Sequence, residues 1–216
     1  MNVSELIHKL EPYIVKIIEE YVKYNTSTGT GGTLFLPREQ AIWLFDSGGV
    51  AIKDYSADGD GFSSANADAS SGDVIWIPPT TITGNHTITA GAHVVGASRY
   101  GSIFTGQITG GAASSIENLT VSRTANSADT LIGVDAPSSG TFYINGCDIK
   151  AVQSGSGNAY AISADVNSST IEVWNSYLYG SSGSGSGYGA YRDSGTSAAA
   201  YIYGGWVRGS THPCSE

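Results

Sequence analysis

Charged residues are scarce in this sequence, and basic residues are the scarcer kind. Charged side chains make up 13% of the 216 residues, against about a quarter in an average soluble domain. The formal net charge is −9. Nucleic-acid binding draws much of its affinity from basic side chains that neutralise phosphates, so this balance argues against a nucleic-acid partner. The same balance argues against binding to anionic membrane surfaces.

Long hydrophobic runs and secretory signals are also lacking. No apolar run approaches the roughly 20 residues that a membrane-spanning helix needs, so we expect no membrane span. Residues 1–12 have neither the basic start nor the apolar centre of a secretory signal. We therefore expect the chain to be made and assembled in a cytoplasm, even where it acts outside the cell.

Cysteine is rare, and the motifs of cofactor and metal sites are missing. Cys147 and Cys214 have no metal-ligand spacing. They are expected to be ordinary thiols, and a disulfide that staples the C-terminus is the alternative. The sequence contains no phosphate-binding loop, no recognisable catalytic triad and no His/Cys cluster. We expect no cofactor and no metal.

Glycine and aromatic residues are plentiful instead. The chain has 29 glycines, 13 tyrosines and 4 tryptophans, and 40% of it is hydrophobic. So much glycine is costly in helices but is expected in a fold with many tight turns. The hydrophobic fraction argues against disorder. Composition therefore predicts a folded, turn-rich protein.

Residues 1–24 stand apart as an amphipathic segment. Their apolar residues recur at alternating steps of four and three, with isoleucine at both kinds of core position, which favours trimers over dimers. Pro12 lies inside the pattern and predicts a kink or break. We expect a coiled-coil helix that makes a homotrimer; an amphipathic helix packed on its own domain is the alternative. The expected oligomerisation residues are Val3, Ile7, Leu10, Ile14, Ile17, Tyr21 and Tyr24.

A repeat runs through residues 116–207. In each unit two apolar residues are separated by four others, and the first members of successive pairs are 28, 29 and 29 residues apart. A fixed period of this kind indicates stacked repeats. Because the units are β-rich and lack helical periodicity, they predict the coils of a parallel β-solenoid, in which each coil buries its apolar side against its neighbours. The pairs are Ile116/Val121, Ile144/Ile149, Val173/Leu178 and Ile202/Val207.

These patterns divide the chain into four parts. We expect an N-terminal helix at 1–24, a linker and a neck of short strands at 25–73, a solenoid at 74–210 and a tail at 211–216. Within the solenoid, residues 74–115 would supply about two less regular coils. The polar stretch 57–73 is interpreted as turns. The predicted fold class is all-β with an N-terminal α-helix.

The stretch GDVIWIPPTTITGNHTITAGAHVVGAS, followed by SIENLTVSR, resembles the opening of pectate-lyase-like right-handed parallel β-helix domains of bacteriophage tailspikes and tail fibres. The upstream stretch KDYSADGDGFSSANADASSGD is similar to the lead-in of tailspikes but shows no capping helix. The resemblance covers residues 54–207. It implies a right-handed β-helix and a virion protein that attaches to other virion proteins through its N-terminal helix.

Three acidic residues end strands at matching positions of the repeat. Asp135, Asp165 and Asp193 each open a turn of the form Asp-x-x-Ser/Thr-Ser, and we expect them to lie in one column. Aspartate side chains commonly cap backbone N–H groups in turns, which is the favoured interpretation. A glycosidase pair of carboxylates is the alternative.

Aromatic residues crowd the last two repeats. They are open to three interpretations, namely packing between coils, contact with sugar rings, and a subunit interface. The candidate carbohydrate-binding residues are Tyr177, Tyr179, Tyr188, Tyr191, Arg192, Tyr203 and Trp206.

The sequence and the resemblance together predict a non-enzymatic, structural or adhesive virion appendage. It would be a homotrimer anchored through its N-terminal region, with the β-helix exposed for attachment to a host surface glycan. A polysaccharide depolymerase, either lyase or glycosidase, is one alternative. A capsid decoration protein and a bacterial surface adhesin are others.

Overall fold

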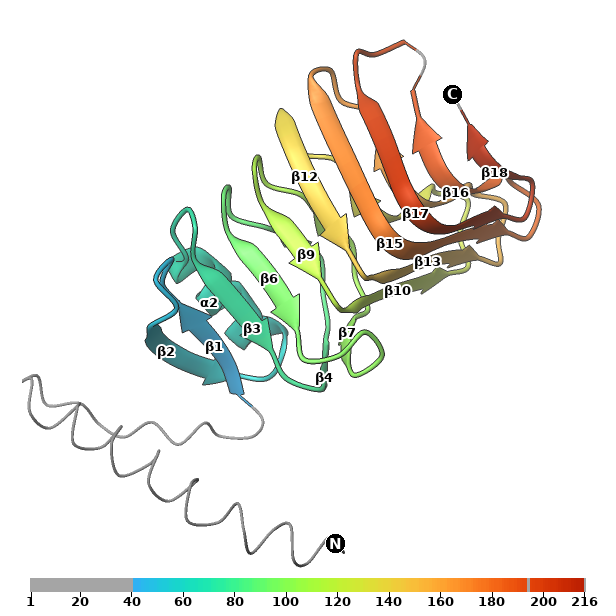
Figure 1. Ribbon diagram of the computed structural model, residues 1–216. Helices are drawn as coiled ribbons and strands as arrows, with labels where there is room; N and C mark the ends of the chain where they lie inside the picture. The colour runs from blue at the N-terminus through green and yellow to red at the C-terminus, as the bar shows by residue number, and fades with distance from the viewer. Residues whose placement is uncertain (1–40, 194, 216) are drawn as a thin grey trace, which may run out of the picture. The chain divides into compact units, whose positions relative to one another are not determined.

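Parallel strands stacked in three ladders form a β-solenoid of about four turns (Figure 1). The computed structural model describes residues 41–193 and 195–215. The coiled coil and trimer predicted for residues 1–24 lie outside the described residues, as do residues 25–40 of the predicted linker and neck. The β-solenoid itself is confirmed, and the protein is mostly β with one short helix.

Each coil contributes to all three ladders. The first contains β3 (Val74–Ile77), β6 (His93–Gly96), β9 (Ser115–Glu117), β12 (Gly140–Asn145) and the starts of β15 (Ser169–Ser182) and β17 (Ala199–Gly209). The second contains β4 (Thr80–Ile82), β7 (Ser102–Phe104), β10 (Thr120–Ala125), β13 (Asp148–Gln153) and the ends of β15 and β17. The third contains β5 (His86–Thr87), β8 (Ile108–Thr109), β11 (Leu131–Asp135), β14 (Ala159–Ala164), β16 (Gly187–Arg192) and β18 (His212–Ser215).

The apolar pairs of the repeat form two columns along the core, as the period predicted. Ile116 stands opposite Ile144 in the first ladder. Ile144 stands opposite Val173, and Val173 stands opposite Ile202. Burial of the same positions in coil after coil is therefore what the repeat encodes. The second column contains Val121, Ile149, Leu178 and Val207.

A left-handed residue forms the corner between the first and second ladders in coil after coil. Because five positions separate Ile116 from Val121, strand alternation alone would place them on opposite faces. The corner residue resets the alternation, so both side chains reach the core. Asparagine and glycine adopt this conformation at the lowest cost. The corner residues with positive φ are Asn118, Gly146, Asn175 and Gly204.

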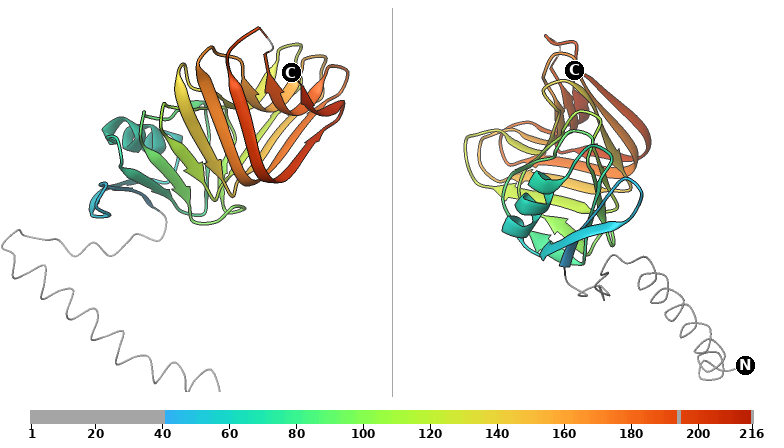
Figure 2. Two further views of the ribbon diagram at one scale, coloured as in Figure 1. Left: turned by 45° about the horizontal axis from the view of Figure 1, so that its top comes forward. Right: turned by 90° about the vertical axis from the view of Figure 1, so that its left-hand side faces the viewer.

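A hairpin and a helix cover the N-terminal end (Figure 2). Strands β1 (Ala41–Phe45) and β2 (Ala51–Ser56) are antiparallel, and β1 also pairs antiparallel with β3. Helix α2 (Gly59–Asp68) follows. Its Phe62 ring packs edge-on against the rings of His86 and Phe104, with centroids 4.8 and 5.0 Å apart.

Helix α2 corrects the interpretation of residues 57–73 as turns without a capping helix. Asp58 is its N-cap, and the Oδ1 atom accepts a hydrogen bond of 2.7 Å from the Gly61 N–H. Phe62 and Ala65 lie three positions apart and are both fully buried. Tertiary packing of this short apolar face supplies the stability that the Gly- and Ser-rich composition does not.

The expected column of three acids is wrong for Asp135. Asp135 stands opposite Ser163, and Ser163 stands opposite Tyr191. The third ladder has a period of 28 residues here, since Leu131 pairs with Ala159, whereas 30 residues separate Asp135 from Asp165. Asp135 is therefore offset from the column by two positions.

Two further findings concern the C-terminal part and the cysteines. Strand β18 lies in the segment that was expected to be a tail and pairs in parallel with β16. Cys147 and Cys214 are both free, so the interpretation as ordinary thiols is confirmed. Among the described residues, no helix has the length and hydrophobicity to cross a membrane.

Candidate functional site

Aromatic rings stack along the outer face of the first ladder. The ring centroids of Tyr143 and Trp174 are 5.9 Å apart, and the ring planes are inclined by 26°. Trp174 and Tyr203 are 5.2 Å apart, with an inclination of 19°. Because Trp174 is covered by a ring on either side, it serves as a contact between coils rather than as a platform for a ligand. Tyr203, at the C-terminal end of this column, is 49% exposed.

The outer face of the second ladder combines aromatic rings with cations. Tyr177 and Tyr179 lie side by side on β15, with ring centroids 6.4 Å apart. Lys150 Nζ is 5.9 Å from the Tyr177 centroid, and the Arg208 guanidinium carbon is 5.8 Å from the Tyr179 centroid. Trp206 stands opposite Tyr177 in the ladder and is 77% exposed, the highest value among the large hydrophobic residues described.

Asp148 holds the lysine of this face in place. Its Oδ2 atom accepts a hydrogen bond of 2.7 Å from Lys150 Nζ, and the aspartate side chain is 7% exposed against 40% for the lysine. The ammonium group is thereby kept over the ring of Tyr177. The second-ladder face thus presents the exposed indole of Trp206, with hydrogen-bond donors on Arg208 of the same strand and on Lys150 of β13, on the far side of β15.

Tyrosines also cluster on the third ladder, but they are packed together. Tyr160 and Tyr191 stack with centroids 4.2 Å apart and an inclination of 8°. Tyr188 lies 5.8 Å from Tyr160. Tyr160 is buried, and burial raises the pKa of both Tyr160 and Tyr191. This arrangement supports packing between coils more than ligand contact.

A polar group on the same ladder contains Asp135. Its Oδ2 atom accepts a hydrogen bond of 3.3 Å from Gln107 Nε2, and Gln107 Oε1 accepts one of 2.9 Å from Arg123. Burial, and next the negative charge of Asp165, raise the pKa of Asp135 to about 6. A carboxyl group with this pKa can act as a proton donor near neutral pH.

The turn-capping role expected of these acids is visible at Asp193. Its Oδ1 atom accepts a hydrogen bond of 2.9 Å from the Gly195 N–H, and its carbonyl accepts one from the Thr196 N–H. Asp135 accepts a hydrogen bond from the adjacent Ala136 N–H at 3.0 Å. Capping is therefore confirmed at Asp193, whereas Asp135 combines a local bond with contacts to another coil.

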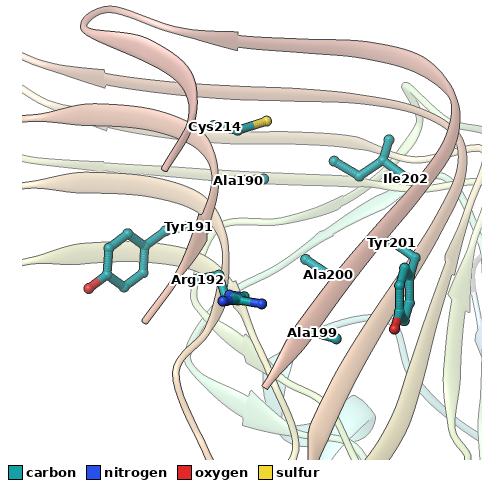
Figure 3. A pocket seen from close by; sticks show the side chains of 8 residues that line it. All are labelled: Ala190, Tyr191, Arg192, Ala199, Ala200, Tyr201, Ile202 and Cys214. Atoms are coloured by element: carbon teal, nitrogen blue, oxygen red, sulfur yellow. The ribbon is translucent and has the colours of Figure 1, made fainter. Parts of the chain in front are cut away.

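The C-terminal end of the solenoid contains a cavity of about 240 Å³ between β16, β17 and β18 (Figure 3). Ala190, Ala200 and Ile202 line it from facing strands, and Cys214 lies at the same end. The Arg192 side chain extends into the space between β16 and β17, and its buried Nε has no hydrogen-bond partner among the described residues. Within the described residues, this cavity lies beside the last coil of the solenoid.

The seven residues predicted to bind carbohydrate do not form one surface. Tyr177, Tyr179 and Trp206 share the second-ladder face, whereas Tyr203 lies beyond the corner on the first. The other three belong to the third ladder; they are Tyr188, Tyr191 and Arg192.

Sequence reasoning missed the two cations of the second-ladder face. The positions of the core columns could have predicted these two cations. Ile149 and Val207 face inward, so the residues on either side of each face outward by strand alternation. Applied to β13 and β17, that rule selects Lys150 and Arg208.

The fold and these faces define a parallel β-solenoid with an aromatic and cationic outer surface near its C-terminal end. In the comparisons with known proteins, no family model, no curated protein and no solved structure matches the chain. Within residues 41–193 and 195–215, no cluster of three or more His, Cys, Asp or Glu side chains is arranged to hold a metal ion.

Proposed function

We propose that this protein is a structural and adhesive virion appendage, similar to phage tail fibres and tailspikes, whose β-solenoid binds glycans through the second-ladder face. The observation that carries the proposal is the exposure of Trp206 beside Tyr177 and Tyr179. The apolar C–H face of a sugar ring packs on an exposed indole. Lys150 and Arg208 supply charged hydrogen-bond donors for the hydroxyl groups of the sugar.

The architecture supports an appendage because a solenoid is a stiff, extended body. Each coil is bonded to the next along three ladders, and the core columns are continuous from coil to coil. Such a body carries a binding face away from its point of attachment. In this proposal, residues 1–24 attach the protein to the virion and form the trimer. The proposal also includes a right-handed solenoid, as in the pectate-lyase-like domains that the sequence resembles.

The glycan proposal is tested by titrating the protein with a panel of bacterial capsular polysaccharides and lipopolysaccharides. We expect Trp206→Ala to weaken binding at least about ten-fold, which corresponds to about 1.4 kcal/mol. The matched control is Tyr100→Ala, which removes a ring that is 72% exposed in another part of the chain, and its affinity should equal that of the unmodified protein. Equal affinities for both variants, or no binding to any member of the panel, would contradict the proposal.

The trimer proposal is tested separately by measuring mass in solution. The full chain should have three times the mass of one chain, and removal of residues 1–24 should abolish that trimer. A monomer in both cases rules the trimer out. Phage capsid or tail genes beside the gene for this protein would favour a virion protein, including a capsid decoration protein, over a bacterial surface adhesin.

A polysaccharide depolymerase is the second candidate, favoured by the environment of Asp135. Glycosidases pair a carboxylic acid of raised pKa with an ionised carboxylate. Asp135 has a pKa of about 6, and Asp165 is close enough to contribute to it. Release of new reducing ends or unsaturated uronates from a polysaccharide, lost in Asp135→Asn, would establish the enzyme. Absence of product across the panel would leave the binding proposal in place.

A further inference from the structure

The outer faces of the three ladders differ in charge. On the first ladder, Glu117 and Glu172 follow buried isoleucines and therefore point outward. On the third ladder, Asp135 ends β11, and Asp165 and Asp193 directly follow β14 and β16. The whole chain has a net charge of −9. Neither of these two faces is therefore suited to an anionic ligand.

The second-ladder face has the opposite balance, with Lys150, Arg208 and a single acid, Asp148. The acid is paired with Lys150 at 2.7 Å, and its side chain is only 7% exposed, so it adds little negative charge to the surface. Arg208 is exposed and contacts the ring of Tyr179, and it forms no ion pair within the part of the chain that the structure describes. This face therefore carries one positive charge that no acid balances.

The two cations lie on either side of β15, which is the middle strand of the three (Figure 1). Lys150 approaches the ring of Tyr177 from β13, and Arg208 approaches the ring of Tyr179 from β17. Their strands are two steps apart in the ladder, which corresponds to about 9–10 Å. A ligand that contacts both cations must therefore lie across the strands, along the axis of the solenoid.

Trp206 offers an indole that no other ring covers. It stands opposite Tyr177, yet among the described residues it makes no stacking contact with another ring, whereas Trp174 is stacked on both sides. Trp206 and Arg208 are two positions apart on β17, so their side chains point to the same face from Cα atoms about 7 Å apart. An apolar platform and a guanidinium group thus flank a space of the size of one sugar ring.

Asp148 adds an unsatisfied acceptor to the same face. It stands opposite Tyr177 in the ladder, and its Oδ1 atom is buried without a hydrogen-bond partner among the described residues. A buried acceptor without a donor is costly in the free protein, and a donor from a ligand removes that cost. Sugar hydroxyl groups are such donors, and Lys150 has further N–H groups for hydroxyl oxygens. The pair of Asp148 and Lys150 therefore fits hydroxyl groups, whereas Arg208 remains available for an anion.

We propose that the glycan bound by the second-ladder face is acidic, and that Arg208 pairs with the carboxylate of a sugar whose ring packs on Trp206. Recognition of an acid in this way rests on the glycan-binding function proposed above. The guanidinium group has parallel N–H donors that match the two oxygens of a carboxylate. The next sugar toward β13 places its hydroxyl groups at Asp148 and Lys150. The ligand class is thus a polysaccharide that contains uronic acids or other sugars with a carboxylate.

Each acidic polysaccharide of the panel is compared with its carboxyl-reduced form, in which carbodiimide and borohydride have converted the carboxylates to primary alcohols. We expect the members that bind the full chain to be acidic. Reduction should weaken their binding at least about ten-fold, because hydrogen bonds between charged groups are lost. Equal affinity for both forms, or preference for neutral members, overturns the acidic specificity but leaves glycan binding in place. Absence of binding to every member overturns both.

Substitution of Arg208 tests which residue binds the carboxylate. Arg208→Gln should weaken binding of the acidic form about ten-fold and that of the reduced form much less, since the reduced form lacks the partner of Arg208. Arg208→Lys should recover part of the loss, because it keeps the charge without the fork of donors. The control Lys53→Gln changes the net charge equally at an exposed residue of β2 and should not alter the affinity. Equal losses for both forms with Arg208→Gln, or an equal loss with Lys53→Gln, contradict the pairing of Arg208 with the carboxylate.

Discussion

Arg99 donates a hydrogen bond of 2.6 Å from Nε to the carbonyl oxygen of Gly146, 47 positions later in the chain. Its Nη2 atom donates to the carbonyl oxygen of Asn175, one coil further along. Both acceptors belong to left-handed corner residues. One side chain therefore ties together the corners of two later coils, with hydrogen bonds strengthened by its charge.

Replacement of Arg99 by alanine is expected to destabilise the solenoid by about 1.5–3 kcal/mol, because two carbonyl groups lose a charged donor. Arg99→Lys should give an intermediate loss, since an ammonium group cannot reproduce the fork of the guanidinium. Urea unfolding followed by circular dichroism measures both. Arg208→Ala is the control and should cost less than about 1 kcal/mol, because its cation–π contact lies on an exposed strand. Equal losses for Arg99→Ala and Arg208→Ala would contradict the role of Arg99.

The loops between the second and third ladders need glycine where successive coils approach closely. A Cβ atom added at Gly157 would overlap the carbonyl oxygen of Asp129 in the preceding coil. We expect Gly157→Ala to lower the free energy of unfolding by about 1–3 kcal/mol, because the backbone of one coil must shift. In the control Gly195→Ala, the nearest atom is a side-chain oxygen of Asp193 at 3.4 Å, an ordinary contact. If the urea midpoint falls equally in both variants, the close approach of Gly157 to the Asp129 carbonyl does not explain the loss of stability.

The core columns were predictable from the sequence because burial depends on the period. Every coil places the same positions inside, so Ile116, Ile144 and their successors had to stay apolar at a near-constant interval. The second-ladder face follows from the same columns by alternation. The core columns do not encode the register of the third ladder. The loops before this ladder vary in length, so in the sequence Asp135 seemed to occupy the same repeat position as Asp165, although it pairs with Ser163.

Helix α2 was less predictable because its local and tertiary signals conflict. Its sequence, GDGFSSANAD, contains glycine, serine and aspartate, which favour turns in isolation. The helix depends on Asp58 as N-cap and on Phe62 reaching His86 and Phe104, which lie more than 20 residues away in sequence. A local sequence pattern cannot predict contacts between residues so far apart in the sequence.

We expect the ionised carboxylate of Asp135 to destabilise the folded protein at neutral pH, and we expect this cost to disappear in mild acid, where Asp135 is protonated. Its pKa is raised to about 6 by burial and by Asp165, above the unperturbed value of 3.8. The folded state thus binds an extra proton between about pH 4 and pH 6, and the ionised carboxylate is a cost above that range. After a discount for solvent screening, Asp135→Asn should stabilise the protein by about 1–2 kcal/mol at pH 7.5 and much less at pH 4. Urea unfolding at both pH values measures the difference.

Asp165→Asn is the companion to that experiment. It removes the charge of Asp165 but leaves the burial of Asp135, which is the larger cause of the shift. The pH dependence assigned to Asp135 should therefore shrink but persist. A stability difference for Asp135→Asn that is the same at pH 4 and pH 7.5 would show that the carboxyl group is not the titrating group.

Cys147 provides a probe of how the solenoid opens. It is fully buried, its Sγ atom contacts the Asn145 carbonyl at 3.3 Å, and burial raises its pKa to about 12. In a Cys214→Ser background we expect alkylation of Cys147 to be at least about a thousand-fold slower in the folded protein than in urea, because the thiol reacts only when a coil opens at a cost of about 4 kcal/mol or more. Mass spectrometry at pH 8 measures the rate, and a thiol introduced by Tyr100→Cys in the same background should react at the rate of a free thiol. Fast labelling of Cys147 would mean that the coils separate locally at low cost, and the continuous core columns would then fail to explain the stability of the fold.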